Sequence, residues 1–137
     1  MTFFINQTIA VLLIFIVASP SLVYSDQVQI NLSNDISYDN ISVSCKSNTG
    51  KDLGTKLLGP GTNFTWTGDI NVPGENEIWL CALQCTPLKG YYGNFTLFIS
   101  KRDNTRCGQR CLWSAREDGI YLYIPAHFTY EFQFKWE

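Results

Sequence analysis

The sequence predicts an antiparallel β-sandwich of about eight strands in two sheets, held together by disulfides. Short runs in which apolar and polar residues alternate recur along the chain, and this is the pattern of half-buried strands. Turn-forming residues separate the runs, and no stretch has helical periodicity. Five cysteines follow an apolar leader, and small secreted domains commonly depend on disulfides.

The leader has the properties of a secretory signal peptide. The first 25 residues carry no charged side chain, and Ile9 to Val17 is an unbroken apolar run. Such a run is too short to span a bilayer. Val23 and Ser25 occupy the minus-three and minus-one positions of a cleavage site. We expect a signal peptide over residues 1–25 and one mature domain over residues 26–137, with an uncleaved anchor helix as the alternative.

Strands in the first half of the mature chain follow from alternation. The first is expected over residues 27–32 and the second over residues 41–45, each apolar at every second position. Polar residues 47–50 end the second strand. A third strand is expected over residues 53–58, closed by the Gly-Pro-Gly turn at 59–61.

A fourth strand holds Phe64 and Trp66, and residues 68–75 form a predicted surface loop because they are polar and contain Pro-Gly. The fifth strand covers residues 77–83, where two apolar faces compete for the interior. A half-cystine and a Trp gain most from burial, so the expected inward set is Trp79, Cys81 and Leu83.

The sixth strand is expected over residues 91–100, and a charged loop over residues 101–110. A hairpin follows over residues 107–123, because Asp118-Gly119 supplies the positive φ values of a tight turn. Its predicted inward residues are Cys111, Trp113 and Ala115. After Pro125, a last strand over residues 128–136 alternates through Phe128, Tyr130, Phe132, Phe134 and Trp136.

Sequons for N-glycosylation provide a second indication of which strand faces are exposed to solvent. They lie in the predicted mature domain at Asn31, Asn40, Asn63 and Asn94, and each is a candidate glycan site. A glycan on Asn63 directs Thr65 outward and Phe64 and Trp66 inward. The same reasoning at Asn94 places Phe95, Leu97 and Ile99 inside.

All the cysteines fall in the predicted mature domain, at Cys45, Cys81, Cys85, Cys107 and Cys111. A secreted chain meets oxidising conditions, so disulfides are expected. The two four-residue spacings also allow a zinc site, which is less favoured because zinc ligands usually lie closer together. The odd count leaves one thiol, either buried and inert or joining two chains.

Charge and residue types exclude several classes of function. The chain has 10 Lys+Arg, 12 Asp+Glu and a formal net charge of -2, which argues against nucleic acid or an anionic membrane as a partner. A single histidine, His127, lacks both the second imidazole of a two-histidine ribonuclease and a nucleophile elbow. We expect no catalytic residue, metal or cofactor. Paired-carboxylate hydrolysis and a calcium site on Asp52 are weak alternatives.

The order of several motifs resembles one known family. It runs Ser44-Cys45-Lys46-Ser47, Asp52-Leu53-Gly54, Phe64-x-Trp66, Trp79-x-Cys81, then Cys107, Cys111-x-Trp113 and Asp118-Gly119-Ile120-Tyr121. Across essentially the whole mature chain, this order is similar to that of the plant self-incompatibility S-protein family, small secreted proteins also called S-protein homologues. The resemblance implies a β-sandwich and an extracellular signal recognised by pollen or by another cell surface.

The same resemblance implies two disulfides among the family cysteines Cys45, Cys81, Cys107 and Cys111. We expect Cys45 to pair with Cys111 and Cys81 with Cys107, although spacing does not fix connectivity. Cys85 stands about where the family often has an aromatic residue, so it is the expected unpaired thiol. Ser44 replaces the usual His of the family and is interpreted as a tolerated polar neighbour of Cys45.

Founding members of the family are stigma-secreted determinants of poppy that stop incompatible pollen through calcium signalling and a pollen membrane protein. By resemblance, this chain is expected to be a monomeric ligand of a cell-surface receptor, bound through its polar loops. The candidate recognition residues are Asp69, Glu75, Lys101, Arg102, Asp103 and Arg106. For the charged run, a merely solvated loop is the alternative. For the protein, the alternatives are a homologue acting in development or defence, or a secreted enzyme or inhibitor.

Overall fold

The computed structural model describes residues 27–71, 76–85 and 90–137, so the predicted signal peptide lies outside it. Its elements are β1 (Gln27–Asn34), β2 (Ile41–Ser47), β3 (Asp52–Leu58), β4 (Asn63–Asp69), β5 (Ile78–Cys85), β6 (Tyr92–Ile99), α2 (Ser100–Arg106), β7 (Arg110–Arg116), β8 (Gly119–Ile124), the 3₁₀-helix η1 (Pro125–His127) and β9 (Thr129–Phe134). Within these ranges, no helix is long and apolar enough to cross a bilayer.

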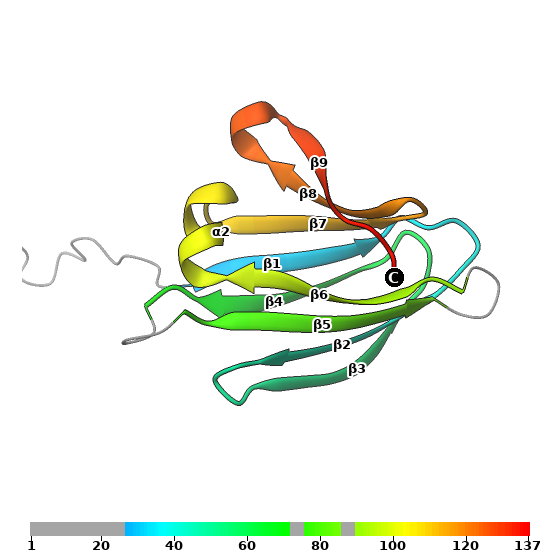
Figure 1. Ribbon diagram of the computed structural model, residues 1–137, viewed down its shortest axis with the longest axis horizontal. Coiled ribbons are helices and arrows are strands. Elements are labelled where there is room, and N and C mark those ends of the chain that lie inside the picture. Colours follow the sequence, from blue (N-terminus) through cyan, green and yellow to red (C-terminus); the bar gives the residue numbers. More distant parts are fainter. Residues whose placement is uncertain (1–26, 72–75, 86–89) are drawn as a thin grey trace, which may run out of the picture.

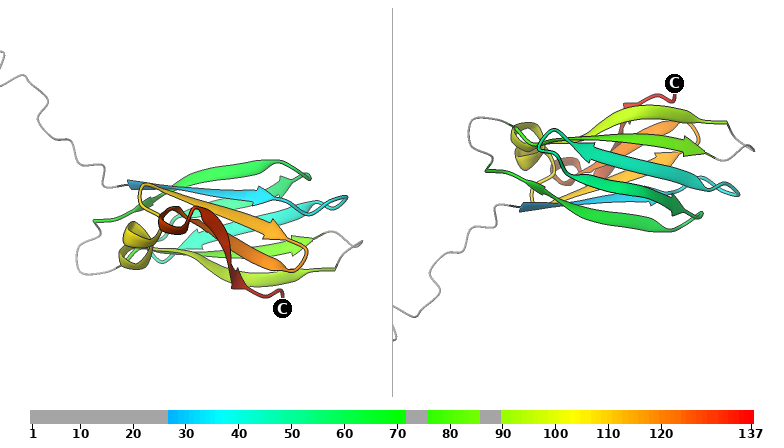
Figure 2. Two further views of the ribbon diagram at one scale, coloured as in Figure 1. Left: turned by 90° about the horizontal axis from the view of Figure 1, so that it is seen from above. Right: turned by 90° about the horizontal axis from the view of Figure 1, so that it is seen from below.

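The strands form two sheets that pack face to face, as Figures 1 and 2 show. One sheet has the order β4-β1-β7-β8-β9 and the other the order β3-β2-β5-β6. The strands run along the long axis of the domain, and α2 lies at the end where β1 begins (Figure 1). We call this the α2 end. The predicted β-sandwich is confirmed.

One strand pair is parallel, in contrast to the antiparallel pairing of the other described strands. β1 pairs with β7 in parallel, with Gln29 opposite Arg110 and Leu32 opposite Trp113. The direction follows from the connections: β6 ends at the α2 end, α2 turns the chain there, and β7 starts beside the start of β1 (Figure 1). The larger sheet therefore contains one parallel pair, β1 and β7, among antiparallel pairs.

The predicted inward faces of β5 and β7 are confirmed. All six side chains, Trp79, Cys81, Leu83, Cys111, Trp113 and Ala115, are at most 1% exposed. In β4, Trp66 is buried, and the half-buried Phe64 stacks on it with ring centroids 5.2 Å apart. Period-two alternation thus identified the core of these strands correctly.

A register shift changes the end of β6. Phe95 and Leu97 are buried as predicted, but the inward assignment of Ile99 is wrong, since Phe98 is fully buried and Ile99 only half-buried. The β5–β6 register shifts between Trp79 and Leu80, so the alternation slips by one residue. The ring of Phe98 lies against β4 at Gly68, where an added Cβ would come within 2.5 Å of it.

The β7–β8 hairpin turns one residue earlier than predicted. Glu117 and Asp118 form the turn, and Gly119 already pairs with Arg116. Gly119 has φ of 152°, and a Cβ added there would lie 2.4 Å from the carbonyl oxygen of Phe134. This glycine is therefore required for the close approach of β9 rather than for the turn itself.

The last strand begins later than predicted. Phe128 ends η1 in the left-handed conformation with φ of 53°, and its side chain is 85% exposed. β9 pairs with β8 from Thr129 onward. Trp136 is buried, whereas Phe132 is 51% exposed, so the five aromatic residues of this stretch do not share one buried face.

The helix α2 consists of Ser100, which was predicted to end the sixth strand, and residues 101–106, which were predicted as part of a loop. Asp103 is completely buried, and its Oδ2 accepts a hydrogen bond from the backbone N–H of Ile99 at 2.8 Å. The buried carboxylate of Asp103 therefore accepts a hydrogen bond from a backbone N–H at the start of α2, where the helix itself provides no acceptor. The helix is too short to show a periodic apolar stripe, which explains the wrong prediction.

The predicted disulfide connectivity is wrong. Cys45 and Cys81 are bonded to each other across the β2–β5 pair, where they lie directly opposite with Cα atoms 4.1 Å apart. Cys107 and Cys111 form the second disulfide, which joins the end of α2 to the start of β7. Each bond connects near neighbours in space, whereas Cys45 and Cys111 belong to different sheets. A zinc site on these cysteines is incompatible with this pairing.

Cys85 is a free and buried cysteine at the end of β5. Burial, and secondly the charge of Asp39, raise the pKa of the thiol from 9.0 to about 11. We predict that the native protein does not react with a thiol reagent at pH 8, and that one thiol per chain reacts after unfolding. Thiol titration with and without denaturant measures this, and Cys85→Ala is the blank. Rapid native labelling would contradict the prediction.

The same pKa fixes the sign of a stability change at high pH. The unfolded thiol loses its proton near its ordinary pKa, whereas the folded thiol keeps it up to about pH 11. The contribution of Cys85 to stability is therefore complete below pH 9 and is lost as the pH rises through the folded pKa.

Candidate recognition surface

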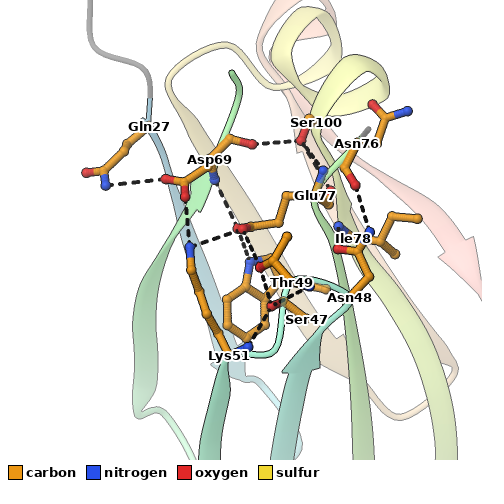
Figure 3. Close-up of polar contacts among 11 residues, drawn as sticks. Gln27, Ser47, Asn48, Thr49, Lys51, Asp69, Asn76, Glu77, Ile78 and Ser100 are labelled. Atoms are coloured by element: carbon orange, nitrogen blue, oxygen red, sulfur yellow. Dashed lines mark hydrogen bonds and ion pairs between the residues drawn. The ribbon is translucent and has the colours of Figure 1, made fainter. Parts of the chain in front are cut away.

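A buried carboxylate, that of Glu77, connects the loops at the α2 end (Figure 3). Its side chain is 1% exposed. Oε1 accepts hydrogen bonds from Trp79 Nε1 at 2.7 Å and from the backbone N–H of Asp69 at 3.0 Å. Oε2 accepts from Thr49 Oγ1 at 3.0 Å and from Lys51 Nζ at 3.1 Å. The charge is thus paired and hydrogen-bonded, as a buried carboxylate requires.

Lys51 carries this network to the surface. Its Nζ lies 2.8 Å from Asp69 Oδ2 as well as 3.1 Å from Glu77 Oε2. The hydrogen bond to Asp69, and then that to Glu77, raise the pKa of Lys51, so the ammonium group stays charged at neutral pH. The side chains of Lys51 and Asp69 are 47% and 33% exposed. They present a fixed pair of opposite charges to solvent.

Two asparagines fix the neighbouring backbone, as Figure 3 shows in part. Asn48 donates from Nδ2 to the carbonyl of Asn76 at 2.8 Å and accepts at Oδ1 from the N–H of Ile78 at 2.8 Å. Asn76 Oδ1 accepts from the N–H of Lys101 at 2.9 Å. The loop after β2, the strand β5 and the start of α2 are therefore held by side chains.

Ser100, the first residue of α2, completes the connection. Its hydroxyl donates to the carbonyl of Asp69 at 2.7 Å and accepts from the backbone N–H of Glu77 at 2.7 Å. Its own N–H donates to the carbonyl of Glu77 at 3.0 Å. This buried serine joins both ends of the β4–β5 connection to the helix.

Three charged residues of α2, Arg102, Asp103 and Arg106, form a cluster around the buried carboxylate of Asp103. Both oxygens of the Asp103 carboxylate are engaged by Arg102, at 3.0 Å from Nε and 2.9 Å from Nη2. Arg106 Nη2 lies 2.7 Å from Asp103 Oδ1, and its guanidinium is 5.7 Å from the ring centre of Trp113. Burial lowers the pKa of Arg106, and the charge of Asp103 opposes that effect.

The structure describes five of the six candidate recognition residues, and these five differ in their exposure to solvent. Asp103 is fully buried, so its assignment to a recognition surface is wrong. The side chains of Arg102 and Arg106 are 32% and 24% exposed and serve mainly to hold Asp103. Asp69 and Lys101 lie at the α2 end, the latter exposed. Glu75 is outside the described residues.

Sequence reasoning missed the central residue, Glu77, although a signal was present. Trp79, Cys81 and Leu83 were predicted to face inward, and two residues before Trp79 the same face reaches Glu77. An acidic residue at a predicted core position requires partners. Thr49 and Lys51, in the loop between β2 and β3, are the hydrogen-bond donors to this carboxylate.

His127 and Asp52, which the sequence offered as candidates for catalysis and for calcium binding, make local contacts in the structure. The Nδ1 atom of His127 lies 2.9 Å from Glu131 Oε2, and both side chains are exposed. Asp52 accepts from the N–H of Gly54 at 2.8 Å. Among the described residues, no three His, Cys, Asp or Glu side chains are grouped to hold a metal ion.

Comparison with known proteins identifies the family. The family model described as plant self-incompatibility protein S1 matches residues 29–136. The chain belongs to this family. Residues 29–136 include α2 and all of the strands except the first two residues of β1, so the S1-family assignment covers nearly the whole sandwich, and the resemblance to this family is confirmed.

Curated relatives of this S1-family chain come from Arabidopsis thaliana. S-protein homolog 6 is 32% identical over 83 residues, or 61% of this chain and 57% of the relative, so the match spans little more than half of that protein. S-protein homolog 21 is 29% identical over 112 residues, covering 77% and 83% of the two chains. S-protein homolog 31 is 32% identical over 96 residues, 68% of each.

A solved structure of a self-incompatibility protein homologue has the same fold. It superposes with a TM-score of 0.62 at 18% identity, over 82% of this chain and 96% of the other. That protein is described as belonging to a widespread family of small, highly stable, secreted proteins from plants.

Proposed function

We propose that this S1-family chain is a small secreted signalling protein, recognised by a cell-surface receptor on pollen or on another plant cell. The proposal is of a ligand rather than an enzyme. Its support is the family membership, together with the description of the solved homologue as secreted.

The observation that carries the proposal is the network around Glu77. It fixes three segments, the β2–β3 loop, the two ends of the β4–β5 connection and the start of α2, against one another (Figure 3). Binding residues are commonly found on loops held by a rigid scaffold. Because hydrogen bonds hold these described segments in place before binding, little of their conformational entropy would be lost on contact with a receptor.

Lys101 is the residue with which to test this surface. It is exposed, and only its backbone N–H takes part in the network. We predict that Lys101→Glu leaves the unfolding midpoint unchanged and weakens binding to the receptor-bearing cells at least about tenfold, as reversal of a charge at an interface does. Lys135→Glu, the same charge change on an exposed residue after β9, should have no effect.

The assay uses purified, disulfide-bonded protein on two kinds of pollen, of matched and of unmatched genotype. Growth arrest in the matched pollen alone is expected of a stigmatic determinant. Equal growth of both would overturn that role. Labelled protein that binds no stigma, pollen or other plant cell surface would overturn the receptor proposal altogether. Stigma-restricted transcripts favour the pollination role, and broad or stress-linked transcripts favour a homologue in development or defence.

A further inference from the structure

The outer face of the β3-β2-β5-β6 sheet contains a shallow hollow beside a glycosylation sequon. The hollow has a volume of about 280 Å³ and is lined by Ser42, Ser44, Ala82, Gln84, Tyr92 and Asn94, among others. A second hollow of about 240 Å³ shares Ser44, Ala82 and Asn94. The first hollow alone is close to the lower limit for small-molecule sites, about 300 Å³.

The strand β6 directs both polar residues of the sequon, Asn94 and Thr96, to this face. Asn94 is exposed and Thr96 half-buried on the outer side, whereas Gly93 and Phe95 face the core. Tyr92, two residues before Asn94, lies on the same outer side and is 54% exposed. A sugar on Asn94 would therefore have an aromatic ring next to it on the same strand.

The lining of the hollow is suited to a sugar. The hydroxyls of Ser42 and Ser44 and the amide of Gln84 make no hydrogen bond within the domain as described, so they are available to sugar hydroxyls or an acetamide. Ala82 and the Tyr92 ring offer apolar surface for the non-polar face of a pyranose. Small side chains at the centre of the sheet leave the space open.

The other sequons lack this arrangement. On β1, the residue two positions before Asn31 is Gln29, which has no ring. The residue two positions before Asn63 is Gly61, which has no ring. Asn40 follows Tyr38, but Tyr38 is in the left-handed conformation with φ of 65° and its side chain is 87% exposed. Only β6 combines a strand-held sequon, an aromatic residue and a hollow in the described part of the chain.

We propose that Asn94 carries an N-linked glycan whose first N-acetylglucosamine lies in this hollow against the ring of Tyr92. In its attachment, a bond forms between Asn94 Nδ2 and the anomeric carbon of a lipid pyrophosphate-linked oligosaccharide. The bond from that carbon to the pyrophosphate oxygen breaks, and the amide nitrogen loses one proton. The proposal requires passage through the secretory pathway and is independent of any receptor.

The test is protein secreted from plant cells, trimmed enzymatically to a single N-acetylglucosamine per site. Mass spectrometry of the peptide containing Asn94 should show the sugar, and an unmodified Asn94 would overturn the proposal. Thermal unfolding is then measured for the wild type, Tyr92→Ala, Asn94→Gln and the double variant. We expect Tyr92→Ala to lower Tm by about 2–6 °C more in the glycosylated background than in the Asn94→Gln background.

An equal effect of Tyr92→Ala in both backgrounds would mean that the sugar does not rest on the ring, and would overturn the contact. A direct measurement is independent of stability: magnetisation transfer between the Tyr92 ring protons and the sugar protons, which should be absent in Tyr92→Ala. Asn63→Gln is the matched control, because it removes a sequon whose sugar has no such ring and should not alter the effect of Tyr92→Ala.

Discussion

Glu77→Ala is expected to lower the free energy of unfolding by about 2 to 6 kcal/mol, because two donors lose their acceptor at about 1 to 3 kcal/mol each. The substitution leaves the indole N–H of Trp79 and the backbone N–H of Asp69 without their acceptor. It also leaves the ammonium group of Lys51 with one carboxylate in place of two. Unpaired buried donors cost more than the net gain of making the bond. Denaturant unfolding followed by tryptophan fluorescence measures the change.

The control for this prediction is Glu131→Ala. Glu131 also pairs with a basic side chain, that of His127, but both members are exposed. Exposed ion pairs contribute about 0 to 1 kcal/mol, so little change is expected. If Glu77→Ala destabilised the domain no more than Glu131→Ala does, the Glu77 network would not be the framework of the α2 end.

Replacing both Cys45 and Cys81 by Ala is expected to cost about 4 kcal/mol, because this disulfide closes a long loop. Its cysteines are 36 residues apart, compared with a separation of 4 for Cys107 and Cys111. Loss of loop-closure entropy in the unfolded chain then predicts about 2 kcal/mol for the shorter bridge. The comparison is made with both double variants, by denaturant unfolding under conditions that do not reduce disulfides.

Connectivity is checked first by peptide mapping without reduction. A peptide joining the segments of Cys45 and Cys81 is expected, and one joining Cys45 to Cys111 would contradict the structure. Equal destabilisation by the two double variants would show that loop length is not the main source of stabilisation.

Alternation of apolar residues predicted the strands well because each sheet is buried on one face. Val28, Ile30 and Leu32 are completely buried, and so are Cys111, Trp113 and Ala115. At these positions a shift of one residue would expose the whole apolar set, so the pattern and the structure must agree. Where a bulge occurs, as between Trp79 and Leu80, the alternation ends and the assignment of Ile99 failed.

The disulfides and the helix depended on long-range information. The pairing of Cys45 with Cys81 follows from the register of β2 against β5, which no local pattern encodes. Helix α2 has seven residues, too few for a periodic signal. Its charged residues suggested a solvated loop, whereas Asp103 is an internal anchor for two arginines and a backbone N–H.

The sequence indicated the candidate surface only as a set of polar loops, and the role of these loops in recognition stays a prediction. The polar stretches after Trp66, near Asn48 and at Lys101 do meet at one end of the sandwich. Which of their side chains face solvent could not be known, because the assignment depends on whether a charge finds a partner inside. Asp103 finds one, and Lys101 stays exposed.

The parallel pairing of β1 with β7 governs the order in which the domain can fold. β1 lies between β4 and β7, so the first strand of the domain needs partners from the middle and the last third of the chain. Such distant contacts are slow to form because the intervening chain must be ordered first. β1 gains its second neighbour only once β7 has been synthesised, and β8 and β9 follow it in the same sheet, so the domain is expected to fold after translation of most of its length rather than strand by strand.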